Sequence, residues 1–447
     1  KLNFMKKLIL VTKKIKKFNH KITVEGDKSL SIRFALLASQ ASGKSTAYNL
    51  LRSDDVINTL NCLKKLGVKI KFKNNCCEIH GNGINSFKYK RNLVLNLGNS
   101  GTLGRLLLAL LIRSPYKIKL IGDQSLSKRD FSRVILPLRK FGANFYPKNK
   151  KTLPIHIKGT NFLRPIKYFE KRGSAQVKSC IMLGALNSPG ITRIIAKKSR
   201  NHTEILFKYL KIPISIRKTK NFDFIKVIGK KNFASFNYNI PSDISSSAFF
   251  IVLTLLSNNS SLTIRNVNIN SSRIGSIYIL NKMGAKIKLK NIKNYRGERV
   301  ADIFVKSVKS YKAINCPKKH NSSAIDEFLI IFLIAAKAKG VSYFKDLAEL
   351  NQKESPRLKL GSKILNMIGI KTKLTNESIK IYGQPNLELS QNYEIKNYLK
   401  DHRIFMMSVV AALTFGGNWK IYNSDSIKTS FPSFLKIVKK LGGKIKQ

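Results

Sequence analysis

The sequence predicts an α/β fold built from six repeats. Six apolar segments of helical length each begin with a polar cluster, and short strands rich in β-branched residues alternate with them. The polar clusters are anchored at residues 28, 101, 174, 243, 326 and 401, which gives intervals of 73, 73, 69, 83 and 75 residues. Such a period indicates an internally repeated architecture. At 447 residues the chain is long enough for two domains of three repeats each.

The first predicted helix begins at Lys28 and ends before Gly43. A helix N-terminus already presents unpaired N–H groups and about half a positive charge. Lys28, Ser29 and Arg33 add an ammonium, a hydroxyl and a guanidinium to this end of the helix. A solvated first turn would favour acidic residues instead, so the pattern predicts a site for an anion.

The other five repeats open in the same way. Their polar openings and apolar helices lie at 98–102 before 106–112, 173–178 before 181–186, 242–247 before 249–256, 326–327 before 328–336, and 401–403 before 404–413. A short strand, a polar loop and a second helix follow in each repeat. The second helix ends in a Leu-x-x-x-Gly type of sequence that leads into a basic strand, at 63–70, 138–145, 280–287, 365–372 and 438–445, whereas 207–214 lacks the glycine. A solenoid of such modules is the alternative, but the length of the apolar helices favours enclosed cores.

The net charge of +61 would by itself suggest a nucleic-acid or membrane-surface protein. The lysines are spread through every segment, however, and only 13–17 and 148–151 form local clusters. We therefore expect no nucleic-acid partner. No apolar run approaches the roughly 18 residues of a membrane span, so we expect no membrane partner either.

Neither a disulfide framework nor a metal site is expected. The five cysteines are an odd number without a CxxC pair, and the six histidines show no metal-ligand spacing. Near the N-terminus, Lys13 and Lys14 cut short the apolar run at 8–11, and no small-residue cleavage site follows. We expect this run to be the first strand of a cytoplasmic protein.

Ten short motifs, in order along the chain, resemble those of the enolpyruvyl transferase family. They are Gly-Asp-Lys-Ser at 26–29, Leu-Gly-Asn-Ser-Gly-Thr at 97–102, Gly-Asp-Gln-Ser-Leu-Ser-Lys-Arg at 122–129, Ser-Ala-Gln-Val-Lys-Ser at 174–179, Ser-Arg-Asn-His-Thr-Glu at 199–204, Ile-Asp-Glu at 325–327, Lys-Glu-Ser at 353–355, Arg-Leu at 357–358, Asp-His-Arg at 401–403, and Thr-Ser-Phe-Pro at 429–432. The resemblance extends from about residue 20 to the C-terminus and is closest to the members that act on shikimate 3-phosphate.

The resemblance implies a two-domain inside-out α/β barrel of six βαβαββ units, three per domain. One domain would comprise residues 27–240, and the other residues 1–26 plus 241–447, with the active site in the cleft between them. It further implies a monomer that uses no metal or organic cofactor.

The resemblance also implies the substrates, phosphoenolpyruvate and shikimate 3-phosphate, and a reaction by addition and then elimination. Both substrates are multiply anionic, and the arginine fork suits carboxylates and phosphates. The implied phosphoenolpyruvate-binding residues are Lys28, Gly101, Arg129, Gln176, Arg357 and Arg403. The implied residues for shikimate 3-phosphate are Lys28, Ser29, Arg33, Ser174, Gln176, Arg200, Asp326 and Lys353. Asp326 would be the base and Glu354 the acid, with Lys28 assisting either proton transfer.

Several of these residues could have a structural role instead of a functional one. Asp326, Asn99 and Thr102 could cap helices, and Asp243 could order the fourth helix. Arg105 could be an ion-pair partner, and His402 could be a packed, hydrogen-bonded side chain. Thr429 replaces a lysine that relatives often carry near the Phe-Pro of the last motif, and Lys428 lies one residue earlier.

Two other functions remain as alternatives. A related enzyme that transfers enolpyruvyl to a UDP-sugar would require a cysteine within 122–129, where this chain has none. A basic RNA-binding protein would leave Asp326 and Glu354 unexplained. Because Gly101 leaves room beside the phosphoenolpyruvate site, we expect the inhibitor glyphosate to compete with phosphoenolpyruvate.

Overall fold

The computed structural model describes residues 7–73 and 76–447. The chain divides into two compact units. Unit 1 comprises Lys1–Glu25, Pro241–Lys293 and Arg299–Gln447, and unit 2 comprises Gly26–Ile240 and Asn294–Glu298. Each unit has its own hydrophobic core, whereas repeats in a solenoid contact only their neighbours.

Six helices, one per repeat, fill the two cores. They are α1 (Lys28–Ala38), α3 (Gly101–Leu110) and α6 (Ala175–Asn187) in unit 2, and α8 (Ile244–Leu256), α11 (Phe328–Lys337) and α13 (His402–Phe415) in unit 1. Nearly every residue of α8 and α11 is buried, and all residues of α11 except Lys337 are apolar, as expected for helices that other elements surround.

Unit 2 contains three four-stranded sheets of one design. Their strand orders are β14 (Asn237–Asn239), β3 (Ser42–Tyr48), β5 (Cys76–Asn82) and β4 (Lys69–Lys73); β6 (Val94–Asn96), β7 (Ile118–Ile121), β9 (Ile155–Lys158) and β8 (Asn144–Tyr146); and β10 (Lys167–Glu170), β11 (Ile191–Lys197), β13 (Phe222–Ile228) and β12 (Ile214–Lys218). In each sheet the first pair is parallel and the other two pairs are antiparallel.

Unit 1 contains related sheets. Their strands are β16 (Lys286–Tyr295), β17 (Glu298–Lys306), β15 (Ser261–Asn268) and β2 (Asn19–Ile22); β20 (Val341–Phe344), β22 (Ile379–Tyr382) and β21 (Thr372–Leu374); β1 (Ile9–Val11), β24 (Gly416–Ile421) and β23 (Leu389–Ile395); and the short pair β18 (Tyr311–Lys312) and β19 (Ala338–Lys339). The tip of the β16–β17 hairpin, Asn294–Glu298, groups with unit 2.

A second helix completes each repeat. These helices are α2 (Asp54–Lys65), α5 (Ser132–Phe141), α7 (His202–Tyr209), α9 (Gly275–Lys282), α12 (Arg357–Met367) and α14 (Phe434–Lys440). Short helical turns are α4 (Gln124–Ser127), α10 (Asn321–Ala324), η1 (Lys318–His320), η2 (Ala348–Gln352) and η3 (Ser424–Thr429).

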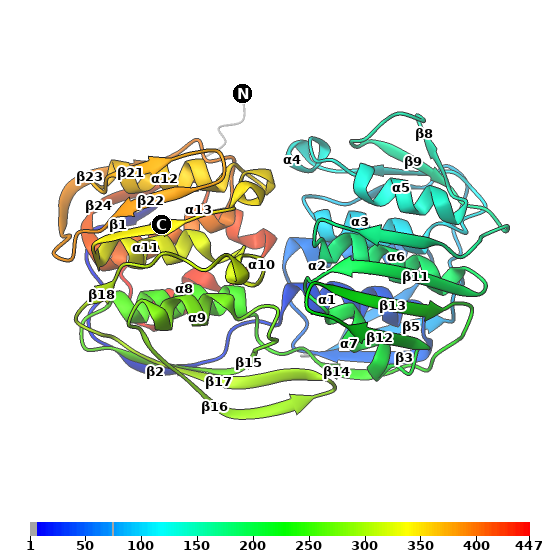
Figure 1. Cartoon of the computed structure of the whole chain (residues 1–447), viewed down its shortest axis with the longest axis horizontal. Coiled ribbons are helices and arrows are strands. Elements are labelled where there is room, and N and C mark those ends of the chain that lie inside the picture. The colour runs from blue at the N-terminus through cyan, green and yellow to red at the C-terminus, as the bar shows by residue number, and fades with distance from the viewer. Residues whose placement is uncertain (1–6, 74–75) are drawn as a thin grey trace. The chain divides into compact units, whose positions relative to one another are not determined.

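The sheets of each unit lie outside its buried helices (Figure 1). In β11, for example, Thr192, Ile194 and Ala196 face the core, and the residues between them are exposed. The predicted α/β fold with six βαβαββ repeats, three in each unit, is confirmed, as is its inside-out arrangement of helices and sheets.

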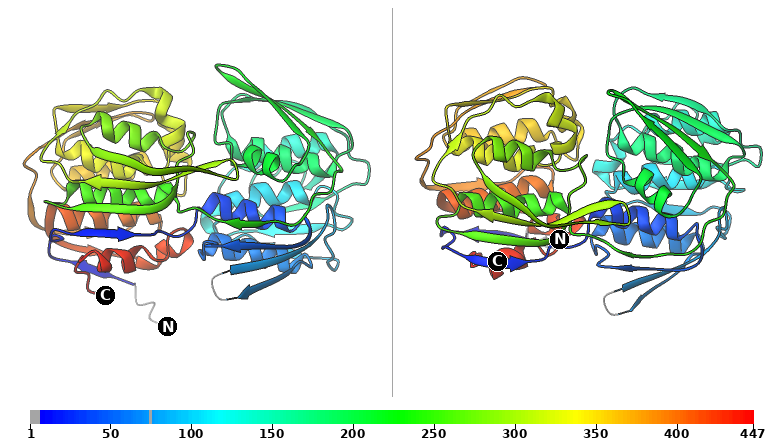
Figure 2. Two further views of the ribbon diagram at one scale, coloured as in Figure 1. Left: turned by 90° about the horizontal axis from the view of Figure 1, so that it is seen from below. Right: turned by 60° about the horizontal axis from the view of Figure 1, so that its bottom comes forward.

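Strands from distant parts of the chain complete some repeats. β1 pairs with β24 in antiparallel fashion, and Leu10 pairs with Lys446, so that the two ends of the described chain meet in one sheet (Figure 2). The strand predicted at 8–11 is thereby confirmed.

Four glycines show how tightly each sheet packs on its helix. Gly81 is the last residue but one of β5, and Gly159, Gly229 and Gly383 directly follow β9, β13 and β22. A Cβ at any of the four would lie within 2.5 Å of a backbone oxygen at or just beyond the end of the first helix of the repeat. Only glycine permits this close approach of strand and helix backbones.

Candidate active site

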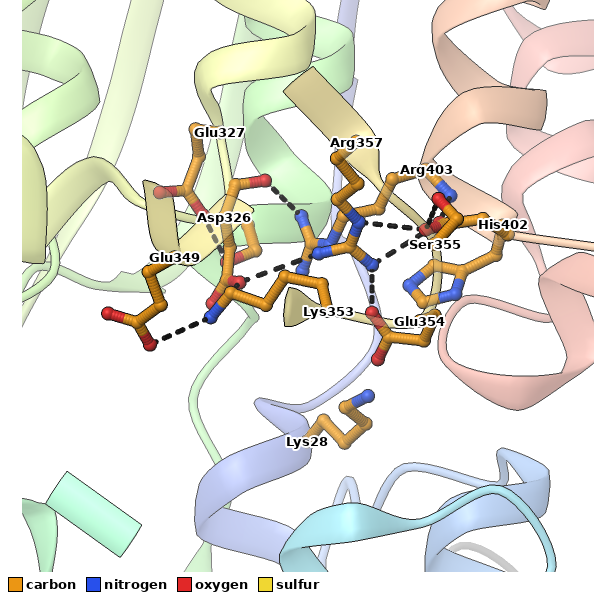
Figure 3. A network of polar contacts seen from close by, with 12 residues as sticks. Lys28, Asp326, Glu327, Glu349, Lys353, Glu354, Ser355, Arg357, His402 and Arg403 are labelled. Carbon is orange, nitrogen blue, oxygen red and sulfur yellow. Dashed lines mark hydrogen bonds and ion pairs between the residues drawn. The ribbon is translucent and has the colours of Figure 1, made fainter. Parts of the chain in front are cut away.

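The buried guanidinium of Arg357 is the centre of a charged cluster in unit 1 (Figure 3). Arg357 begins α12, and its Nε donates a hydrogen bond to Asp401 Oδ2 at 2.8 Å. Nη2 donates to Glu354, and Nη1 lies 3.7 Å from Asp326 Oδ1. One cation therefore holds three carboxylates that come from three different segments.

Burial and charge act in opposite directions on this cluster. Burial alone would lower the pKa of the Arg357 guanidinium, but the attraction of Asp401 and Glu354 outweighs it, and that pKa lies above its ordinary value. Burial would raise the pKa of Asp401, but the charge of Arg357 outweighs it, and the Asp401 pKa is lowered. Both groups therefore carry their charges at neutral pH.

The carboxylate of Asp326 is directed at cations rather than at a helix end. It lies 3.6 Å from Lys353 Nζ, and the backbone carbonyl of Asp326 accepts a hydrogen bond from Arg403 Nη1 at 2.7 Å. The N-cap position of α11 is held by Glu327, whose side chain makes no capping hydrogen bond. The Asp326 carboxylate contacts the cations of the cluster.

A buried polar network supports the Asp326 loop from the core. Glu327 is fully buried and accepts a hydrogen bond from the hydroxyl of Ser245. The same hydroxyl accepts one from Arg273 Nη2 at 2.9 Å. Asp243 caps α8 by accepting hydrogen bonds from two backbone N–H groups, which confirms its expected role in ordering the fourth helix.

Asp401 has two functions at the start of α13. Its Oδ1 accepts a hydrogen bond from the backbone N–H of Arg403 at 2.9 Å and so caps the helix, while Oδ2 binds Arg357. The next residue, His402, is buried, with Nδ1 3.3 Å from Thr429 Oγ1. The prediction that His402 is a packed, hydrogen-bonded side chain is confirmed.

In unit 2, Lys28 forms an ion pair at the start of α1. Its Nζ lies 2.9 Å from Asp55 Oδ2, and both side chains are largely buried. The helix is capped by Asp27, whose Oδ1 accepts from Leu30 N at 2.9 Å. This cap offsets the cost of placing a cation at a helix N-terminus.

Arg33 is fixed one turn further along the same helix. Its Nε donates to Thr203 Oγ1 at 2.9 Å, and Nη2 donates to Ser179 Oγ at 3.1 Å. Nη1 donates to the carbonyl of Ser29 at 3.1 Å. The guanidinium therefore connects α1 with α6 and α7.

Gln176 has a defined orientation because each end of its amide has a partner. Its Oε1 accepts from Arg105 Nη1 at 2.6 Å, and its Nε2 donates to Thr102 Oγ1 at 3.0 Å. Both partners belong to α3, where Ser100 caps the helix instead of Thr102. Arg105 is thus a direct partner of a predicted substrate-binding residue.

Gly101 lies beside two guanidinium groups. A Cβ at this position would be 3.1 Å from Nη1 of both Arg105 and Arg129. Nη2 of Arg129 donates to Asn99 Oδ1 at 3.0 Å, and the Asn99 amide donates to Asp123 Oδ2 at 2.6 Å. Asn99 therefore positions Arg129 and does not cap the helix.

Ser174 opens α6, and its hydroxyl accepts from Val177 N at 3.3 Å. Its backbone N–H and that of Gly173 both donate to Glu170 Oε2. Arg200 lies in the loop before α7 and is half-buried.

The predicted site residues thus fall into two sets. Unit 1 gathers Asp326, Lys353, Glu354, Arg357 and Arg403. Unit 2 holds Lys28, Ser29, Arg33, Gly101, Arg129, Ser174, Gln176 and Arg200 at or near helix starts. Sequence reasoning missed Asp55 and Asp401 as partners, although the Asp-His-Arg motif at 401–403 contained a signal for the second. It expected Arg105 to be an ion-pair partner, and the structure shows Arg105 donating to Gln176.

Residues 7–73 and 76–447 contain neither a membrane-spanning helix nor a metal-binding group of side chains. In this range no helix has both the length and the apolar character needed to cross a membrane. Within the same range, no group of three or more His, Cys, Asp or Glu side chains is arranged to hold a metal ion.

Comparisons with known proteins agree with these features. The sequence model of the family described as EPSP synthase (3-phosphoshikimate 1-carboxyvinyltransferase) matches residues 12–438. The 3-phosphoshikimate 1-carboxyvinyltransferase of Ruthia magnifica subsp. Calyptogena magnifica is 38% identical over 426 residues, which are 94% of this chain and 95% of that protein. The enzyme of the same name from Zymomonas mobilis subsp. mobilis is 36% identical over 437 residues, 97% of this chain and 96% of that protein. The structure of EPSP synthase from Acinetobacter baumannii superimposes with a TM-score of 0.87 at 34% identity, covering 98% of this chain and 99% of that chain. The chain therefore belongs to the EPSP synthase family.

Proposed function

We propose that this chain transfers the enolpyruvyl group of phosphoenolpyruvate to the 5-hydroxyl of shikimate 3-phosphate, releasing phosphate. The observation that carries the proposal is the family match over residues 12–438, joined to a cluster in which Arg357 holds both Asp326 and Glu354. The cluster holds two carboxyl groups beside a cation that can also bind an anionic substrate. In the reaction Asp326 acts as the ionised base, and Glu354 carries a proton when it acts as the acid.

Phosphoenolpyruvate carries a phosphate and a carboxylate, and the assigned residues are mostly cations. They are Lys28, Gly101, Arg129, Gln176, Arg357 and Arg403. Arginine binds such oxygens through two parallel hydrogen bonds. The absence of a side chain at Gly101 lets the substrate come close to the helix backbone. Glyphosate, which is also an anion with a carboxylate and a phosphonate, would compete for these groups.

Shikimate 3-phosphate combines one phosphate, one carboxylate and several hydroxyl groups. Its assigned residues are Lys28, Ser29, Arg33, Ser174, Gln176, Arg200, Asp326 and Lys353. Cations would bind the phosphate and carboxylate, while hydroxyl and carboxylate side chains would bind the ring hydroxyls. The proposal includes a monomer, as the family resemblance implies.

The chemistry requires one proton to leave an oxygen and another to reach a carbon. Asp326 would accept the proton of the 5-hydroxyl as that oxygen bonds to C2 of phosphoenolpyruvate, while Glu354 donates a proton to C3. A tetrahedral intermediate results. The bond from C2 to the phosphate oxygen then breaks, and loss of a proton from C3 restores the double bond. No metal or organic cofactor takes part in this scheme.

The test is phosphate release from phosphoenolpyruvate with either shikimate 3-phosphate or UDP-N-acetylglucosamine as acceptor. We expect turnover only with shikimate 3-phosphate, and competitive inhibition by glyphosate against phosphoenolpyruvate. Asp326→Asn and Glu354→Gln should each lower kcat by about 10²–10⁴-fold, the usual range for a general acid or base.

Glu349→Gln is the matched control, because this exposed carboxylate lies 3.5 Å from Lys353 but has no assigned role. It should change kcat less than about twofold, because exposed ion pairs contribute little. Turnover with the UDP-sugar alone, or normal turnover by Asp326→Asn, would contradict the proposal.

A further inference from the structure

The tip of the β16–β17 hairpin is built into unit 2 by several specific contacts. The backbone N–H of Asn239 donates to Tyr295 Oη at 2.8 Å, and the Arg296 guanidinium lies 4.7 Å from the centre of the Tyr209 ring. Gly297 has a φ of +89°, and a Cβ there would lie 2.8 Å from Ile205 Cγ2. The tip is therefore a fitted part of this unit, although its two strands run in a sheet of unit 1.

The last residue of the tip forms a buried pair with the first residue of α7. Oε1 of Glu298 lies 2.6 Å from Nδ1 of His202, and the two side chains are 0% and 1% exposed. A buried polar pair of this kind is costly to break, because water cannot reach the remaining partner to replace the lost hydrogen bond. The pair therefore fixes where α7 begins.

The two residues after His202 are held in the same way. Thr203 Oγ1 donates to Ser179 Oγ at 2.7 Å and accepts from Arg33 Nε at 2.9 Å. Glu204 Oε1 lies 2.6 Å from Nζ of Lys178, which is fully buried. Three consecutive side chains thus anchor the first turn of α7 to the hairpin tip, α1 and α6.

These contacts hold the N-terminus of α7, which has no side-chain cap at its N-cap residue. Asn201 occupies the N-cap position of α7, but its side chain makes no capping hydrogen bond. Upstream, the carbonyl of Ser199 accepts from Lys178 Nζ at 3.5 Å. Arg200 therefore lies between a carbonyl bound by Lys178 and a histidine bound by Glu298.

We propose that Glu298 is a positioning residue for shikimate 3-phosphate, acting through His202 on the loop that carries Arg200. The inference rests on the proposed function, which assigns Arg200 to that substrate. Removal of the carboxylate would take away one of the three anchors at the start of α7 and let this turn shift, so that Arg200 would no longer be held where the substrate needs it. Phosphoenolpyruvate has no assigned contact with this loop.

The experiment measures binding of shikimate 3-phosphate alone by calorimetry, together with KM for each substrate. It compares the parent protein with Glu298→Ala, Glu298→Gln and Lys293→Ala. Glu298→Ala should weaken binding of shikimate 3-phosphate by about tenfold or more, the loss expected when a charged hydrogen bond is misaligned. KM for phosphoenolpyruvate at saturating shikimate 3-phosphate should change less than about twofold. Glu298→Gln keeps an oxygen for His202 Nδ1–H and should restore most of the affinity.

Lys293→Ala is the matched control, because Lys293 is an exposed residue of the same hairpin. It should bind shikimate 3-phosphate like the parent. Unchanged binding by Glu298→Ala, or equal losses for both substrates, would overturn the proposal and leave a purely structural pair. If Glu298→Ala does not fold, Glu298→Gln and His202→Phe decide. Phenylalanine keeps a ring but has no N–H for Glu298, so a positioning role requires His202→Phe to weaken shikimate 3-phosphate binding far more than Glu298→Gln does. A parent protein that does not bind shikimate 3-phosphate would instead refute the proposed function.

Discussion

Arg357 and Asp401 form a buried ion pair in which the carboxylate also caps a helix. Arg357 Nε donates to Asp401 Oδ2 at 2.8 Å, while Asp401 Oδ1 accepts from the first turn of α13. The start of α12, which carries Arg357, is thereby tied to the start of α13, which carries Arg403. Two residues assigned to phosphoenolpyruvate thus depend on one carboxylate that has no assigned contact with substrate.

Asp401→Ala should be strongly destabilising. It leaves the Arg357 guanidinium buried without its main partner, which typically costs about 3–5 kcal/mol, and it also removes a helix cap. Urea denaturation would measure the loss of unfolding free energy, and KM for phosphoenolpyruvate should rise as well. Glu388→Ala is the control, because its ion pair with Lys14 is exposed and should contribute no more than about 1 kcal/mol. Equal stability of the two variants would contradict this account.

Arg105→Met should raise KM for both substrates. The substitution removes the donor to Gln176 Oε1, so that the amide of Gln176 can turn over. A hydrogen bond from a charged group is worth about 1.5–3 kcal/mol, which corresponds to roughly tenfold or more in affinity. Steady-state kinetics would measure the change. Arg91→Met, at an exposed arginine that lies over the Tyr116 ring, should leave both KM values unchanged.

Several of the assigned residues stand out in the sequence because they occur at helix starts, whereas Arg129, Arg200 and Glu354 lie in loops and were assigned through the family resemblance alone. An apolar helix opened by Lys28 and Ser29, or by Asp401, His402 and Arg403, is visible in a local window, and the period of the repeats gives the fold. Local windows also predicted the capping role of Asp243, which the structure confirms.

The partners of those residues could not be recognised in this way. Asp55 meets Lys28 from 27 positions away, and Glu298 meets His202 from 96 positions away. Such pairs depend on how helices and strands from different repeats pack, and a sequence window contains no record of that packing. The hairpin tip that belongs to unit 2 was missed for the same reason, since its residues look like an ordinary turn.

Gly101→Ala should weaken the binding of glyphosate more than the binding of phosphoenolpyruvate. The new methyl group would lie 3.1 Å from Nη1 of Arg105 and Arg129, so both guanidinium groups must move by a few tenths of an ångström. Glyphosate is the longer of the two anions, so the added methyl group would leave it too little room. We expect KM for phosphoenolpyruvate to rise severalfold, the inhibition constant of glyphosate to rise further, and KM for shikimate 3-phosphate to stay constant. Equal changes for inhibitor and substrate would contradict the steric explanation.

Glu25→Gln should stabilise the protein at neutral pH but not in acid. The carboxylate of Glu25 is partly buried and accepts a hydrogen bond from Ser433 N at 3.3 Å. Burial raises the pKa of Glu25 above its ordinary value of 4.5 and outweighs the lowering effect of the Ser433 hydrogen bonds. The folded chain therefore binds this proton more tightly than the unfolded chain, so unfolding free energy falls as the pH rises above 4.5. Glutamine stays neutral and escapes that loss.

Thermal unfolding at pH 7 should give Glu25→Gln the higher Tm, whereas near pH 4 the variant and the parent should unfold at the same temperature. Glu377→Gln, at an exposed position, should follow the parent at both values. A lower Tm for Glu25→Gln at pH 7 would mean that the ionised carboxylate stabilises this unit, opposite to the sign derived from its burial.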